Sequence, residues 1–146
     1  MGCQPKEEVI EQNIHTNWLF QSQNDSVWHS ATVPGNIFSD LLDNQLIEDP
    51  FTLNNEEKVQ WVSDSIWVYK TQFELSDEIL EKNHIDLIFE GLDARAKIYI
   101  NGNYQLDTDN SFRKYSVNLK DIPHQKTNEL TVVFQPANLI KGGKVP

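Results

Sequence analysis

The chain has 146 residues, 38% of them hydrophobic, a size that suits one domain with one modest core. Its 22 acidic residues against 12 basic ones give a formal net charge of −10, and such a surface repels phosphate backbones, which argues against nucleic-acid binding. The chain has no long apolar run, so the sequence predicts no membrane span.

The N-terminal residues 1–13 are polar and charged without a useful period, which predicts a disordered lead-in before a domain over 14–138 and a tail over 139–146. Cys3 is the only cysteine, so an internal disulfide is excluded. The Gly2-Cys3 pair resembles the end of a bacterial lipoprotein signal, although the hydrophobic stretch that precedes such a cysteine is absent. Two interpretations are equally weighted: a signal remnant on an exported, periplasmic or lipid-anchored protein, or an exposed thiol on a frayed end. Localisation is otherwise open.

The first predicted elements are short strands at 18–20 and 27–32, followed by a turn at 33–35, where proline fixes φ and glycine frees it. Asn36 can cap a short helix. The apolar residues of that helix share one side. They are Ile37, Phe38, Leu41 and Leu42.

Residues 49–60 form the longest stretch without a period, and this stretch ends at Trp61. In a compact domain, a loop of this length is either functional or loose.

The rest of the chain alternates between apolar and polar residues, which is typical of half-buried strands. Strands are predicted at 66–75, 85–89, 94–101, 104–106, 115–119 and 130–134, with a brief helical turn from Ser76 to Leu80. Asn101-Gly102 predicts a tight hairpin turn, because both residues tolerate positive φ. The pattern predicts an all-β antiparallel sandwich, and spacing alone does not separate a jelly roll from an immunoglobulin-like fold.

Two motifs resemble a known family. GLD-x-x-A-x-I-Y-I-N-G at 91–102 and DN-x-F-R-x-Y at 109–115 look like the N-terminal β-sandwich domain of family 2 glycoside hydrolases, most closely the β-mannosidases. The order W-x-F, W, A-x-VPG, DLL, I-x-DPF earlier in the chain is similar to the opening of that domain. The resemblance covers about 18–137 and implies a jelly roll with galactose-binding-domain-like topology.

The resemblance also implies a missing strand. Members of the family continue with a G-W-D-W-G-P segment and a returning strand, neither of which the 146 residues contain. We therefore expect one sheet to lack its last strand or strands, and the isolated chain to be poorly soluble or to dimerise, because unpaired edges invite association.

No residue is assigned a catalytic role. Retaining glycoside hydrolysis needs two carboxyl groups about 5 Å apart, and most acids here fall on polar strand faces or in turns. In the resembled family both catalytic glutamates belong to a separate (β/α)₈ barrel, a fold of roughly 250 residues. The four histidines lack metal-ligand spacing and no phosphate-cradling glycine loop is present, so no metal or cofactor is expected.

The sequence also predicts, on less specific motifs, residues that contact a sugar. Asn55 and Glu56 match the family's Asn-Glu pair in the irregular loop, and with Trp61 they are the candidate residues of a substrate pocket. The alternative is that Asn55 and Glu56 only cap and solvate the loop and that Trp61 is a core residue. Trp67 is in phase with Tyr69 and Phe73, which predicts that it belongs to the core.

The sequence supports three interpretations of function. In the first, the chain is the non-catalytic N-terminal domain of a β-mannosidase-like hydrolase that removes terminal β-D-mannose with retention. The domain then shapes the pocket and contacts the catalytic barrel in the same polypeptide. The second is a free-standing carbohydrate-binding module, and the third a purely structural sandwich.

Overall fold

The computed structural model describes residues 9–48, 60–92 and 95–136 of the chain. Cys3, Asn55 and Glu56 lie outside these ranges. Within them, no helix is long and apolar enough to cross a bilayer. The elements are β1 (Leu19–Ser22), β2 (His29–Ser30), α1 (Ile37–Asp43), α3 (Gln60–Asp64), β3 (Trp67–Glu74), α4 (Asp77–Leu80), β4 (Asp86–Phe89), β5 (Ala96–Ile100), β6 (Asn103–Thr108), β7 (Tyr115–Asn118), a 3-10 turn η1 (Leu119–Asp121) and β8 (Thr127–Phe134).

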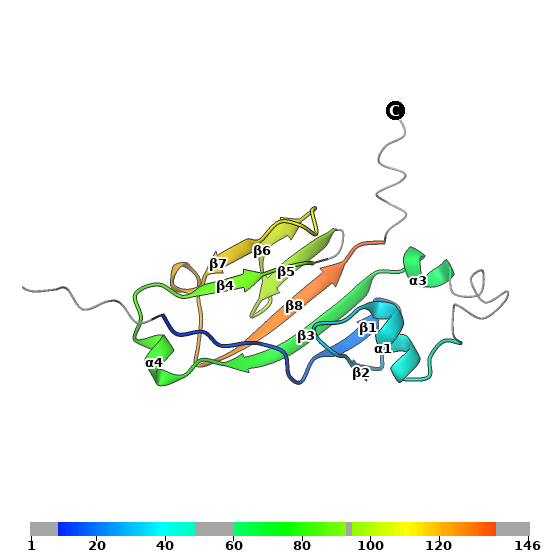
Figure 1. Ribbon diagram of the computed structural model, residues 1–146, viewed down its shortest axis with the longest axis horizontal. Coiled ribbons are helices and arrows are strands. Elements are labelled where there is room, and N and C mark those ends of the chain that lie inside the picture. Colours follow the sequence, from blue (N-terminus) through cyan, green and yellow to red (C-terminus); the bar gives the residue numbers. More distant parts are fainter. Residues whose placement is uncertain (1–8, 49–59, 93–94, 137–146) are drawn as a thin grey trace, which may run out of the picture.

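Two antiparallel sheets build the fold. The larger sheet has the strand order β2-β1-β3-β8-β5-β6, and β4 pairs with β7 in the smaller one, as Figure 1 shows. Inward side chains of the two sheets form a single buried cluster, to which β4 contributes Leu87 and Phe89, β5 contributes Ile98, and β8 contributes Leu130 and Val132. The predicted all-β antiparallel sandwich is confirmed.

The central strand β3 follows the predicted alternation. Trp67, Tyr69 and Phe73 are buried, whereas Gln72 and Glu74 on the opposite face are exposed. Burial of the large aromatic rings supplies much of the apolar area that stabilises a sandwich of this size. The prediction that Trp67 belongs to the core is confirmed.

The β5–β6 hairpin turns at the predicted dipeptide. Asn101 and Gly102 have φ values of 52° and 81°, the left-handed region that a tight two-residue turn requires. Tyr104 lies opposite Tyr99, as the turn position implies. The Asn101 side chain also accepts a hydrogen bond from the Glu129 N–H at 2.8 Å and donates to Asn128 Oδ1 at 2.9 Å, which ties the turn to β8.

Both predicted helix caps are present. Asn36 Oδ1 accepts a hydrogen bond from the Ser39 N–H at 2.9 Å at the start of α1. Ser76 Oγ accepts from the Ile79 N–H at 3.2 Å at the start of α4. Each cap satisfies a backbone donor that has no partner within its own helix, so the local residue type determines where the helix begins.

One prediction about local structure is wrong, and one helix was not predicted. The strand expected at 27–32 is reduced to His29–Ser30, because side chains of Asp25 and Asp40 bind the backbone N–H groups of Val27 and Thr32 that a longer ladder would use. Residues 60–64 form the helix α3, an element that was not predicted; the irregular stretch was expected to end at Gln60, and its residues 49–59 lie outside the described ranges. Five residues with one buried side chain are too few to show a helical period in the sequence.

Candidate functional site

Trp61 is the predicted pocket residue that the described ranges include. Its side chain is 43% exposed on α3, whereas Trp18 and Trp67 are buried. Trp28 is already covered, since Lys70 Nζ lies 3.9 Å from the centroid of its ring. Of the four tryptophans, Trp61 therefore presents the most open aromatic face.

The helix α3 holds Trp61 firmly against the core. Val62 is buried, and its carbonyl oxygen accepts a hydrogen bond from Trp67 Nε1 at 2.8 Å. Ser65 Oγ donates to the Trp61 carbonyl at 2.8 Å. The Trp61 and Trp67 rings are tilted, with centroids 5.8 Å apart, so one side of the Trp61 ring is backed by the core. A ring fixed in this way can stack on the C–H face of a sugar without first losing rotamer freedom.

A buried carboxylate ties α1 to β3. Asp40, 1% exposed, accepts hydrogen bonds from the Thr32 N–H at 2.8 Å and from the Tyr69 hydroxyl at 2.7 Å. Burial raises the pKa of Asp40 above its ordinary value, although the two hydrogen bonds act in the opposite direction. Burial and the neighbouring carboxylate also raise the pKa of Tyr69, which keeps its hydroxyl protonated as the donor. These contacts fix the helix on the sheet and leave no free carboxyl oxygen for an outside group.

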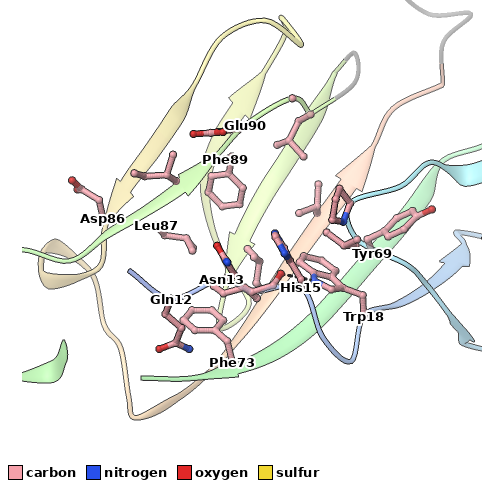
Figure 2. A pocket seen from close by; sticks show the side chains of 18 of the residues that line it. Gln12, Asn13, His15, Trp18, Tyr69, Phe73, Asp86, Leu87, Phe89 and Glu90 are labelled. Carbon is pink, nitrogen blue, oxygen red and sulfur yellow. Dashed lines mark hydrogen bonds between the residues drawn. The ribbon is translucent and has the colours of Figure 1, made fainter. Parts of the chain in front are cut away.

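A long groove of about 1220 Å³ opens between the two sheets. Residues 9–15 line one side, residues 81–92 line the other, and inner-face side chains of β3 and β8 form its floor. Figure 2 shows Leu87 and Phe89 directed from β4 into the groove, toward Phe73. The groove is therefore an opening onto the hydrophobic core.

Two exposed acids beside the groove, Asp86 and Glu90, do not form a hydrolytic pair. Asp86 lies 2.8 Å from His84, and Glu90 lies 3.2 Å from Lys114. Asp86 and Glu90 are four positions apart on one extended segment, which separates them by roughly 13 Å, against the 5 Å or so that a retaining mechanism needs. In the three described ranges no group of three or more His, Cys, Asp or Glu residues is placed to hold a metal ion.

The sequence reasoning missed the Asp40–Tyr69 bond and the groove. The partners of the first are 29 positions apart and meet only after α1 packs on β3. The groove depends on which strands pair: among the described residues, β4 has a strand partner on one side, which is β7. The sequence contained a weak signal for the burial of Asp40, because this residue precedes Leu41 on a helix whose apolar side was expected to pack on the core.

Residues 18–143 match the family described as glycosyl hydrolase 2 galactose-binding domain-like. The β-mannosidase of Capra hircus is 34% identical over 130 residues, which cover 88% of this chain and 14% of that enzyme. The mannosylglycoprotein endo-β-mannosidase of Lilium longiflorum is 32% identical over 126 residues, covering 82% of this chain and 13% of that one.

A solved structure agrees with these matches. The crystal structure of the β-D-mannosidase of Dictyoglomus thermophilum is similar with a TM-score of 0.82 and 37% identity, over 88% of this chain and 16% of that one. The chain thus spans only about a seventh of the length of the curated relatives named above.

Proposed function

The chain belongs to the glycosyl hydrolase 2 galactose-binding domain-like family, and from that membership we propose that it serves as the non-catalytic N-terminal domain of an enzyme that hydrolyses β-mannosides. The observation that carries the proposal is the match to the Dictyoglomus thermophilum enzyme, at 37% identity and a TM-score of 0.82 over 88% of this chain. Because that stretch is 16% of the enzyme, the domain is a small part of its relative.

We propose that the catalytic carboxyl groups are supplied by another part of the parent polypeptide. Asp86 and Glu90, which line the groove, are too far apart for a retaining mechanism, and the buried Asp40 is engaged by Thr32 and Tyr69. A (β/α)₈ barrel, with its active site at one face, is the partner that the family resemblance implies. The role of the sandwich is then to brace this barrel.

We also propose that Trp61, with Asn55 and Glu56, walls the substrate pocket at the surface that faces the barrel. Trp61 supports this, because its ring is half exposed while α3 and Trp67 hold it in place. An aromatic wall lowers the entropic cost of binding a sugar ring, and the Asn55 and Glu56 side chains offer hydrogen bonds to sugar hydroxyl groups.

The test is kinetic and uses the complete enzyme with 4-nitrophenyl β-D-mannoside. Trp61→Ala is expected to lower kcat/KM by about twofold to tenfold, since one stacking contact contributes roughly 0.5–1.5 kcal/mol, and Trp61→Phe is expected to restore part of it. Glu56→Ala tests the polar wall in the same assay.

Tyr104→Ala is the matched control. Tyr104 is an exposed aromatic residue on β6, at the opposite edge of the larger sheet from β1 and β2, and its loss should leave kcat/KM unchanged. If Trp61→Ala and Glu56→Ala both behave like Tyr104→Ala, with unaltered thermal stability, the pocket-wall role is wrong.

A further inference from the structure

A second, smaller pocket of about 480 Å³ lies at the end of the larger sheet where β5 begins and β6 ends. Arg95 and Arg113, the only two arginines of the sequence, both line it. Trp61 lies outside this lining. The volume falls within the roughly 300–1,000 Å³ of small-molecule sites, so we name this feature the arginine pocket and ask what it can hold.

The charged residues of the arginine pocket are three cations and two acids: Arg95, Lys97, Arg113, Asp107 and Asp109. Within residues 9–48, 60–92 and 95–136, no carboxylate forms an ion pair with any of the three cations. The pocket thus carries one excess positive charge on a chain whose net charge is −10. A ligand with a single negative charge complements this balance better than a doubly charged phosphate.

The backbone that carries both arginines is held in place. The Arg95 carbonyl accepts a hydrogen bond from the Gln135 N–H at 2.9 Å, and the Arg113 N–H donates to the Asn110 carbonyl at 3.2 Å. Arg95 and Lys97 are two positions apart, so their side chains leave the same face of the sheet. A guanidinium group presents a planar fork of donors that matches a carboxylate, which makes a carboxylate the anion of choice here.

The two acids of the arginine pocket offer acceptors beside these donors. Asp107 Oδ1 accepts from the Tyr104 hydroxyl, and Asp109 Oδ1 accepts from the Tyr115 hydroxyl, both at 2.9 Å. The second carboxylate oxygen of each has no donor in the part of the chain that the structure describes. These oxygens repel a bare carboxylate and accept hydrogen bonds from hydroxyl groups. An aspartate or glutamate side chain from elsewhere therefore fits less well than a carboxylate that has hydroxyl groups next to it.

Thr108 adds a buried donor to the same lining. Its side chain is 1% exposed, and its Oγ1 has no hydrogen-bond partner among the described residues. Buried hydroxyl groups in folded proteins are nearly always hydrogen bonded. A polar ligand in the arginine pocket would give this hydroxyl a partner.

We propose that the arginine pocket binds a monosaccharide acid, a hexuronate, whose carboxylate is held by Arg95 and Arg113 and whose ring hydroxyl groups bond to Asp107 and Asp109. The site goes beyond the proposed function and does not rest on it, because it needs neither the barrel nor the Trp61 surface.

Two-dimensional nitrogen–hydrogen NMR of the 146-residue chain reads this site directly. The arginine Nε–H region holds two signals, one from each proposed ligand of the carboxylate. The chain is titrated with D-mannuronate, D-glucuronate and D-galacturonate. We expect at least one of them to shift both signals along one saturation curve, with a dissociation constant of about 1 mM, as suits a ligand of this size.

Three small molecules separate the parts of the proposal. D-Mannose has the hydroxyl groups without the carboxylate and should shift neither arginine signal. Acetate has the carboxylate without the hydroxyl groups, and inorganic phosphate has more charge in another shape. Each of these two should bind at least about tenfold more weakly than the best hexuronate.

The protein variants are Arg95→Gln and Arg113→Gln, with Lys114→Gln as the matched control. Lys114 follows Arg113 directly, lies outside the pocket lining and is 3.2 Å from Glu90. Each arginine variant should weaken hexuronate binding at least about tenfold, whereas Lys114→Gln, which removes the same charge, should stay within about twofold of the parent chain. Thr108→Val should weaken binding about threefold or more.

Three results would overturn the proposal. The first is that no hexuronate shifts the two arginine signals up to about 10 mM. The second is that acetate or phosphate binds as tightly as the best hexuronate. The third is that Lys114→Gln weakens binding as much as the arginine variants do, which would reveal an unspecific effect of charge. None of these results affects the enzyme role, because that role is tested separately by kinetics.

Discussion

Replacement of Asp40 is expected to reveal how α1 is held on the sheet. Asp40→Ala leaves the Thr32 N–H and the Tyr69 hydroxyl without their shared acceptor, and both distances, 2.8 Å and 2.7 Å, are those of strong hydrogen bonds. An unpaired buried polar group costs about 1–3 kcal/mol, which applies in full to the Tyr69 hydroxyl and only in part to the Thr32 N–H, so the variant should lose about 1–4 kcal/mol of unfolding free energy. That is a large share of the 5–15 kcal/mol typical of a domain. Ser39→Ala, on the exposed side of the same helix, is the control and should change stability by less than about 0.5 kcal/mol.

The pH dependence of unfolding stability separates the effect of the Asp40 charge from the effect of its hydrogen bonds. Because burial raises the pKa of Asp40 above its ordinary 3.8, the folded chain holds this proton more tightly than the unfolded chain does. The resulting contribution to stability is complete below about pH 3.8, falls as the pH rises through the raised pKa, and is absent above it. Asp40→Asn has no such ionisation, and its amide can still accept from Thr32 and donate to the Tyr69 oxygen.

The assay is urea unfolding followed by tryptophan fluorescence between pH 3 and 8, for the parent chain, Asp40→Asn, Asp40→Ala and Ser39→Ala. We expect the stability of Asp40→Asn relative to the parent to improve as the pH rises from 3.8 through the raised pKa of Asp40, and to stay level above that pKa. If the parent instead gains on Asp40→Asn over that interval, the carboxylate is favourably charged in the fold. The reasoning about its burial would then be wrong.

Three further results are expected. Thr108→Val should be neutral or stabilise the chain by up to about 1 kcal/mol in the same assay, because the buried Thr108 Oγ1 has no hydrogen-bond partner in the described structure; a loss of 2 kcal/mol or so would show a hidden partner. Asn128→Ala should cost about 2–4 kcal/mol, since the buried Asn128 amide bonds Asn101, the Gln125 N–H and the Gln125 carbonyl. An Asn128→Ala variant with the same unfolding free energy as the parent chain would contradict this. Calorimetric titration of the isolated chain with mannose should show no binding at about 1 mM, whereas a dissociation constant below that would favour a free-standing carbohydrate-binding module.

Local structure that one or two residues determine was predictable from the sequence. The Asn101-Gly102 turn, the caps at Asn36 and Ser76, and the buried face of β3 all follow from residue type and a period of two. Each depends on neighbours within a few positions, so the tertiary fold did not need to be known.

Features that depend on partners distant in the sequence were not predictable in this way. The Asp40–Tyr69 bond joins residues 29 positions apart, and the β2 ladder is shortened because Asp40 takes the Thr32 N–H. The five-residue helix α3 is held by a hydrogen bond from Trp67 Nε1 to the Val62 carbonyl, and its sequence is too short to show a helical period. Of the three candidate site residues, Trp61 is the one within the described ranges. Its side chain is exposed whereas that of Trp67 is buried, and strand phase could not predict this exposure because Trp61 lies on a helix.

The most direct test of the central claim is a domain exchange in the Dictyoglomus thermophilum β-D-mannosidase, where this chain replaces the corresponding 16% of the enzyme. Turnover of 4-nitrophenyl β-D-mannoside is compared among the intact enzyme, the chimaera and the enzyme without the domain. We expect the chimaera to keep kcat/KM within about tenfold of the intact enzyme, and removal of the domain to lower it at least about a hundredfold, because the pocket wall and the brace are lost. A truncated enzyme as active as the intact one, or a folded chimaera without activity, would contradict the claim.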